Sequence, residues 1–172
     1  MRYGLANFTS DRVAAACAYC QTKGYTGLAA ISNRWSLSRF NPAHAPDPTQ
    51  TGMDDALYNL HLRQSMVAMP YSGLGKGYFA KRATEPDQLP ENVRQLYDND
   101  LNNRRLAALQ TLSRERGLSI TSLTLAFLMQ QPFPVIPVLS FASGSQLKEA
   151  MLAADILLRP AELALLGAGE RF

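Results

Sequence analysis

The sequence predicts an α/β fold in which parallel strands alternate with helices. Short apolar segments recur along the 172 residues, and a helix-forming segment follows each of them. The composition, with 47% hydrophobic and 18% charged residues, is that of a globular protein with a sizeable core. Strands that are each followed by a helix are joined by right-handed crossovers and form a parallel sheet. We therefore expect one domain over residues 1–172, built from four βα units.

Each predicted strand is a short apolar segment that ends in polar or turn-forming residues. These segments are residues 2–8, 28–32, 66–71 and 134–139. The fourth (PVIPVL) is as apolar as a parallel strand covered on both faces.

Capping residues and glycines indicate where the helices begin and end. Thr9 or Ser10 opens the first helix, and Gly24 ends it after Lys23. Further helices are predicted from Met53, over 100–116, over 123–130 after the cap Ser119, from Ser143 or Ser145, and over 160–167. Residues 38–52 are predicted to be irregular. No helix is predicted in the polar segment that contains Pro86 and Pro90.

The charged residues and the cysteines exclude several classes of function. The net charge of +3 is spread along the chain without a Lys/Arg block, so we expect no nucleic acid and no membrane as partner. Cys17 and Cys20 form a C-x-x-C, but His44 and His61 stand alone. We interpret the cysteines as small helix residues and expect no metal site. The cytoplasm is the expected compartment, since no signal peptide or spanning segment is found.

Several segments resemble, in order, the later strands of aldo-keto reductases. Residues 3–8 (YGLANF) are similar to the fifth barrel strand of that family, and 32–37 (SNRWSL) to the sixth strand and its exit. Residues 68–77 (AMPYSGLGKG) are similar to the seventh strand and the loop after it, and 125–138 to the helix and eighth strand. The resemblance implies half of a TIM (β/α)8 barrel and an NADP-dependent oxidoreductase that interconverts carbonyls and alcohols by hydride transfer.

The resemblance also implies that the acid–base residues are not in this chain. In the family, strands one to four carry the catalytic tyrosine, lysine, aspartate and histidine, and a complete barrel takes about 250 residues. We therefore assign no catalytic residue and expect the isolated chain to be inactive. A missing N-terminal half-barrel chain could complete the site and admit a small carbonyl substrate. Alternatively, two copies of the chain form a non-catalytic binding module, or the chain is an inactive gene remnant.

Eight residues are assigned to the cofactor from the resemblance: Asn7, Ser32, Tyr71, Ser72, Gly73, Leu74, Lys76 and Gln146. Asn7 matches the asparagine that holds the nicotinamide carboxamide, and Ser32 stands where the family has a glutamine. Tyr71 matches the aromatic residue that stacks on nicotinamide. The alternative for Asn7 is a strand-end turn residue, and the alternative for Tyr71 is a core aromatic.

The other assigned residues belong to the phosphate and adenosine ends of the cofactor. In the turn 72–77, glycines let backbone N–H groups approach a diphosphate, while Ser72 adds a donor and Lys76 a positive charge. The alternative is a flexible loop. Gln146 matches a residue that contacts the adenosine end.

The substrate cannot be predicted from the loops 38–52 and 80–99, which carry no pattern typical of a sugar, steroid or aldehyde site. Trp35 and Phe40 either line a pocket or pack the loop.

Overall fold

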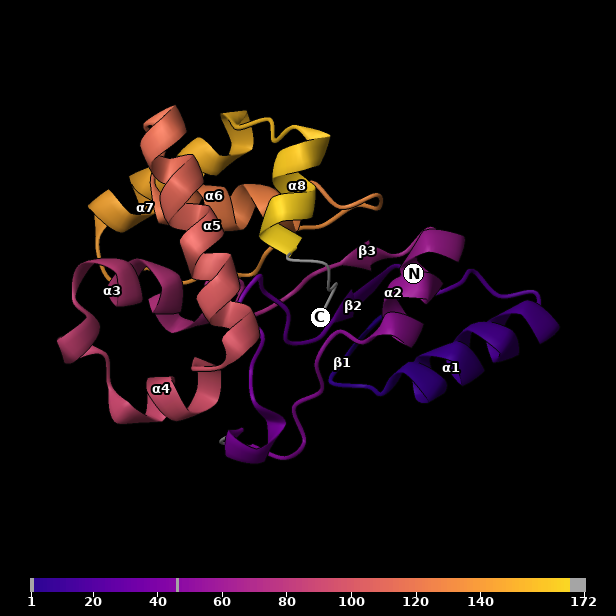
Figure 1. The fold of residues 1–172 in the computed structure, drawn as a ribbon. Helices are drawn as coiled ribbons and strands as arrows, with labels where there is room; N and C mark the ends of the chain where they lie inside the picture. The colour runs from indigo at the N-terminus through magenta and orange to yellow at the C-terminus, as the bar shows by residue number, and fades with distance from the viewer. Residues whose placement is uncertain (1, 46, 168–172) are drawn as a thin grey trace.

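A parallel sheet lies at the start of the chain in the computed structural model, which describes residues 2–45 and 47–167. Strands β1 (Gly4–Ala6), β2 (Ala30–Ser32) and β3 (Val67–Ala68) pair in that order. Helix α1 (Ser10–Thr22) joins β1 to β2, and α2 (Asp55–Arg63) joins β2 to β3 (Figure 1). The predicted α/β class with parallel strands is confirmed.

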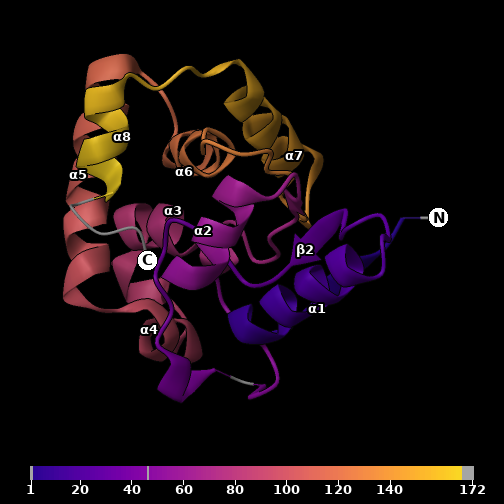
Figure 2. The same cartoon turned by 90° about the vertical axis from the view of Figure 1, so that its right-hand side faces the viewer.

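The remainder of the described chain is mostly helical. Its α-helices are α3 (Tyr78–Thr84), α4 (Glu91–Tyr97), α5 (Asp100–Arg116), α6 (Ile120–Met129), α7 (Gly144–Met151) and α8 (Pro160–Gly167). Single 3-10 turns occur at η1 (Pro42–His44), η2 (Gly75–Gly77), η3 (Pro86–Gln88) and η4 (Leu152–Asp155). Figure 2 looks along α6 and shows α3, α5, α7 and α8 around it.

The predicted count of four strands is not confirmed. Three strands are found in the described chain, and residues 134–139 join β3 only through isolated parallel bridges, Ala68 to Val135 and Tyr71 to Val138. Hydrogen bonds still run along this segment, from Ile136 N to Ala68 O (2.8 Å) and from Val138 N to Pro70 O (2.8 Å). Prolines at 70, 134 and 137 remove N–H donors, which interrupts a regular ladder.

The two faces of the sheet differ in what covers them. Leu5, Ile31 and Ala68 share the face that packs against α1 and α2, and Ile31 and Ala68 are buried there. On the opposite side, which we call the open face (Gly4, Ala6, Ile136 and Val138), Ile136 is 56% exposed and Val138 is 47% exposed. The expectation that residues 134–139 are covered on both faces is therefore wrong for the described chain, because Ile136 and Val138 remain about half exposed on the open face.

The predicted helices agree with the structure where a local cap starts them. Helix α5 has the predicted bounds, and the Ser119 side chain caps α6 while Ser143 caps α7. Helix α2 begins at Asp55, two residues later than predicted, because Asp54 is its cap and accepts from Leu57 N at 2.7 Å. Thr9 precedes α1, but its hydroxyl bonds to the Asp11 carboxylate instead of capping the helix backbone.

Helices α3 and α4 lie in the segment to which the sequence assigned no helix. Tyr78 and Phe79 of α3 and Leu96 and Tyr97 of α4 are almost fully buried. They belong to one large cluster with residues of α5 and α6. Helices of seven residues are marginal in isolation, so this tertiary burial stabilises them rather than local propensity.

Both cysteines are free thiols in helix α1. Cys17 is buried, with its Sγ 3.9 Å from the Sδ of Met66, and Cys20 is partly exposed. Burial raises the pKa of the Cys17 thiol, which makes it less reactive. Among the described residues, no His/Cys/Asp/Glu group could hold a metal ion, and none of their helices has the length and apolarity to cross a membrane.

Candidate cofactor site

The carboxyl ends of the three strands bring together the side chains of Asn7, Asn33 and Tyr71. Because the strands are parallel, these positions meet at one edge of the sheet, where ligands of such folds bind. The Tyr71 hydroxyl donates to Asn7 Oδ1 at 2.7 Å. Two of the predicted cofactor residues, which lie 64 residues apart in the sequence, are thus in direct contact.

Asn7 is held by an amide neighbour that the sequence analysis did not select. The backbone N–H of Asn7 donates to Asn33 Oδ1 (2.9 Å) and to Ser32 O (3.1 Å), and Asn33 Nδ2 donates to Phe8 O (2.9 Å). Asn33 is 3% exposed. Ser32, the residue assigned to the cofactor, lies beside this pair and contributes its carbonyl. The signal in the sequence was an asparagine placed directly after the predicted strand 28–32.

The backbone at the strand ends adopts an uncommon conformation. Asn7 (φ 57°), Ser72 (φ 58°) and Lys76 (φ 57°) are the non-glycine residues with positive φ in the described chain. All three are among the predicted cofactor residues. Non-glycine residues in the left-handed region cost free energy and cluster at functional sites, so this coincidence favours a binding role.

Tyr71 keeps its proton. Burial raises the pKa of Tyr71, and this effect outweighs the nearby Arg34 guanidinium, which acts in the opposite direction. A hydroxyl that donates to Asn7 and resists ionisation is not an activated acid. The ring is only partly buried at the end of the strand, which leaves part of it accessible to a ligand.

The turn after Tyr71 differs from the expected diphosphate cradle in what its residues face. Gly73 is buried, and a Cβ on it would lie 3.1 Å from Leu128 Cδ2 and 3.2 Å from Leu139 Cδ2. Its lack of a side chain therefore serves close packing against α6. Leu74 packs on the cluster of Leu125 and Ala150. Ser72 is partly accessible and Lys76 is exposed, so these two remain available to a phosphate.

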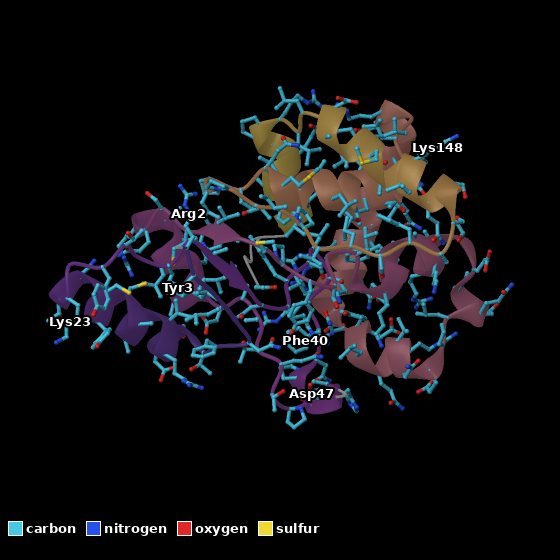
Figure 3. All side chains as sticks on the ribbon, turned by 180° about the vertical axis from the view of Figure 1, so that it is seen from behind. Arg2, Tyr3, Lys23, Phe40, Asp47 and Lys148 are labelled. Carbon is cyan, nitrogen blue, oxygen red and sulfur yellow. The ribbon has the colours of Figure 1, made fainter. Side chains whose placement is uncertain are left out.

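Gln146 has a local structural role at the start of α7. Its Oε1 accepts from Ala142 N at 2.9 Å, and its own N–H donates to the capping Ser143 hydroxyl at 3.3 Å. Gln146 is exposed, and Lys148 on the same helix lies on the far side of the molecule from Phe40 and Asp47 (Figure 3). At this end of the predicted site, the Gln146 oxygen and the Ser143 hydroxyl are therefore engaged within the start of α7.

A cavity of about 930 Å³ lies beside the strand ends. Its walls include Arg34, Trp35 and Phe40, so the two aromatic residues line a pocket as well as packing the loop. Gly52 permits this arrangement, because a Cβ there would lie 2.8 Å from the Phe40 ring. The side chain of Arg34 is 5% exposed and faces the rings of Phe40 and Tyr71, with its Cζ 5.1 Å and 5.8 Å from their centroids.

Comparison with known families identifies this arrangement. Residues 2–168 match the family model described as Aldo/keto reductase family. The chain belongs to the aldo/keto reductase family. Membership supports an oxidoreductase activity in general and agrees with the parallel strands. A search of curated proteins finds no match to the chain.

The site residues of this aldo/keto reductase fit one end of a nicotinamide dinucleotide better than the other. Asn7 brings an amide group next to the partly accessible Tyr71 ring, a combination suited to a carboxamide on an aromatic ring, and the buried Asn33 amide supports Asn7 from behind. Ser72 and Lys76 offer a hydroxyl and a cation to the phosphates. Toward the adenosine, Gln146 is the assigned group, and its oxygen is engaged by Ala142.

Proposed function

We propose that this aldo/keto reductase chain forms the cofactor half of a cytoplasmic, NADP-dependent enzyme that interconverts carbonyls and alcohols. The observation that carries the proposal is the Asn7–Tyr71 contact, made at strand ends where Asn7 and Ser72 both have left-handed backbones. The bound cofactor supplies or accepts the hydride.

The residues of the chain act by positioning the cofactor. Asn7 and Ser32 contact the carboxamide, Tyr71 stacks on the nicotinamide ring, and the turn of Ser72, Gly73, Leu74 and Lys76 covers the diphosphate. An amide side chain both donates to and accepts from a carboxamide, so Asn7 fixes which ring face points toward the substrate. Gln146 contacts the adenosine end through its amide nitrogen, since its oxygen is already bonded.

The proton donor for a carbonyl comes from a partner that covers the open face of the sheet. Tyr71 is an unsuitable acid, because its pKa is raised and its hydroxyl is bonded to Asn7. In the described chain, β1 has one unpaired edge and residues 134–139 have another. Ile136 and Val138 of the second segment are exposed on the open face of the sheet. Proteins rarely leave such edges and faces bare. We propose that an N-terminal half-barrel with four further strands is the partner.

Cofactor binding is tested by titrating the chain with NADPH in a calorimeter. Tyr71→Leu removes the stacking ring and is expected to weaken binding about tenfold, within the 1–3 kcal/mol that stacking of a base on an aromatic residue contributes. Tyr3→Leu is the matched control. Tyr3 directly precedes β1, at the end of the strand away from Asn7, and it is 57% exposed (Figure 3). Equal affinities in the two variants, or no binding of NADPH at millimolar concentration, would contradict the cofactor assignment.

The need for a partner is tested by activity and light scattering. We expect the purified chain to reduce no aldehyde or ketone, and to gain activity when mixed with a family half-barrel of strands one to four, as a 1:1 complex. Turnover by the purified chain alone would show that it holds its own proton donor. A stable dimer of this chain would instead assign the partner role to a second copy.

A further inference from the structure

Arg34 is placed in the cavity by backbone contacts on both sides. It follows β2 and forms parallel bridges to Gly52 and to Tyr71. Its N–H donates to Thr51 O at 2.9 Å, and its carbonyl accepts from Met53 N at 3.0 Å. These bonds fix the main chain of Arg34. Its side chain lines the cavity and is only 5% exposed.

In the part of the chain that the structure describes, the groups in contact with the Arg34 guanidinium are neutral. Nη1 donates to the Tyr97 hydroxyl at 3.3 Å and Nη2 donates to Gln50 Oε1, while the rings of Phe40 and Tyr71 flank the charge. The buried Nε–H has no acceptor within residues 2–45 and 47–167. Among the described residues, no carboxylate forms an ion pair with Arg34.

The nearby carboxylates are directed elsewhere. Asp54 and Asp55 line the cavity, but Asp54 Oδ1 caps α2 by accepting from Leu57 N, and Asp55 is an exposed residue in the first turn of that helix. Asp47 accepts from the backbone N–H (2.9 Å) and the hydroxyl (2.7 Å) of Thr49. Burying an arginine without an anion is costly, and an acceptorless N–H adds to the cost. An anionic ligand in the cavity would offset both costs, because it would pair with the charge and accept from the Nε–H.

We propose that the cavity binds the carboxylate of an oxo-acid substrate through Arg34. This inference rests on the proposed function and names its substrate class: a short carbonyl compound with an acidic end. A guanidinium binds a carboxylate through parallel N–H donors, and the free Nε–H is one of them. The Tyr71 ring lies 5.8 Å from Arg34 Cζ, so the acidic end binds next to the proposed nicotinamide position. The volume of about 930 Å³ suits a small molecule.

The cavity contains its own reporter for a binding experiment. Trp35 is the single tryptophan of the chain and lines the cavity, so its fluorescence reports on occupancy. We would titrate the chain, without NADPH, with 4-oxopentanoate and with its neutral methyl ester. The acid is expected to bind about tenfold more tightly than the ester, as charged hydrogen bonds require. Equal affinities would overturn the proposal.

Substitutions then identify the arginine responsible. Arg34→Met is expected to abolish the preference for the acid, whereas Arg39→Met, an exposed arginine of the same cavity wall, is expected to retain it. If Arg34→Met does not fold by circular dichroism, Arg34→Lys replaces it, since lysine keeps the charge and loses the planar set of donors. An unchanged preference in the folded Arg34 variant would overturn the role of the guanidinium.

Two further comparisons define the ligand. Inorganic phosphate is expected to displace 4-oxopentanoate only weakly, and tighter binding of phosphate than of the oxo acid would overturn the assignment to a carboxylate. Because the titrations contain no NADPH, their outcome is independent of whether the chain binds the cofactor. A failed cofactor titration combined with an acid preference that depends on Arg34 would reject the proposed function and leave the anion site.

Discussion

The helical region and the sheet region of this chain differ in the size of their buried apolar clusters. Residues of α3 to α6 and α8, with a few from the neighbouring loops, form one cluster of sixteen buried residues. The sheet contributes to clusters of five, all on its covered face, and its open face is accessible. The helical region therefore holds the larger core, although Met151, Leu152 and Leu157 remain exposed on its surface, whereas the sheet carries both the candidate site and the open face.

The largest effect is expected from opening a cavity in the helical cluster. Leu109 of α5 is fully buried, so Leu109→Ala should lower the free energy of unfolding by about 2–5 kcal/mol. Leu157→Ala is the matched control, because Leu157 is 77% exposed and should change stability by at most about 0.5 kcal/mol. Urea unfolding measures both. Similar losses in the two variants would show that the helical cluster is not the main source of stability.

A smaller loss is expected where the last helix is attached. The Glu162 carboxylate accepts from Arg159 N (2.7 Å), Arg159 Nη2 (2.8 Å) and Arg116 Nη1 (3.1 Å), and thus joins α8 to the end of α5. Glu162→Gln should cost about 1.5–3 kcal/mol, the range for hydrogen bonds to a buried charge. Glu91→Gln, an exposed carboxylate, serves as control. The measurement is again urea unfolding, and equal effects would refute a special role for Glu162.

On the sheet side, stability should depend on pH through His61. Its ring stacks on Phe133, Nδ1 pairs with Met66 O at 3.1 Å, and burial lowers the pKa of His61. The unfolded chain therefore binds a proton more readily than the folded chain, and stability falls as pH decreases below the unfolded value of about 6.5. The midpoint of thermal unfolding should drop between pH 7.5 and 5.5.

The pH effect can be assigned by comparing the two histidines. His61→Gln should flatten the dependence in this window, while His44→Gln, on an exposed position, should leave it unchanged. A dependence that persists in the His61 variant would point to another group.

The smallest effect on the isolated chain is expected on the open face. Ile136 is 56% exposed, so Ile136→Ser should change the free energy of unfolding by about 0.5 kcal/mol or less. The same substitution should weaken assembly with the half-barrel partner, measured by light scattering. A strong loss of stability without the partner would mean that this face is already covered.

Local signals predicted much of the helical region, and non-local contacts set the remainder. Helices α6 and α7 follow from the predicted caps Ser119 and Ser143, and the structure shows that Asn99, which the sequence analysis did not name, caps α5 in the same way. Helices α3 and α4 depend on burial of residues such as Tyr78 and Tyr97, which no local signal reveals.

The candidate site shows the same division. The sequence pattern selected Asn7 and Tyr71, and the structure places them in contact. It did not select Arg34, because the neutral surroundings of that arginine come from Gln50 and Tyr97, which lie 16 and 63 residues away. Whether a charged side chain has an oppositely charged neighbour can be judged only once the three-dimensional structure is known.

The left-handed backbone at Asn7 makes position 7 unusually tolerant of one substitution. Glycine adopts φ 57° without strain, while alanine does not. Asn7→Gly thus removes the amide and keeps the turn, whereas Asn7→Ala removes the amide and strains the turn. The two variants separate ligand recognition from backbone cost at a single residue, so this position can be used to measure each contribution independently.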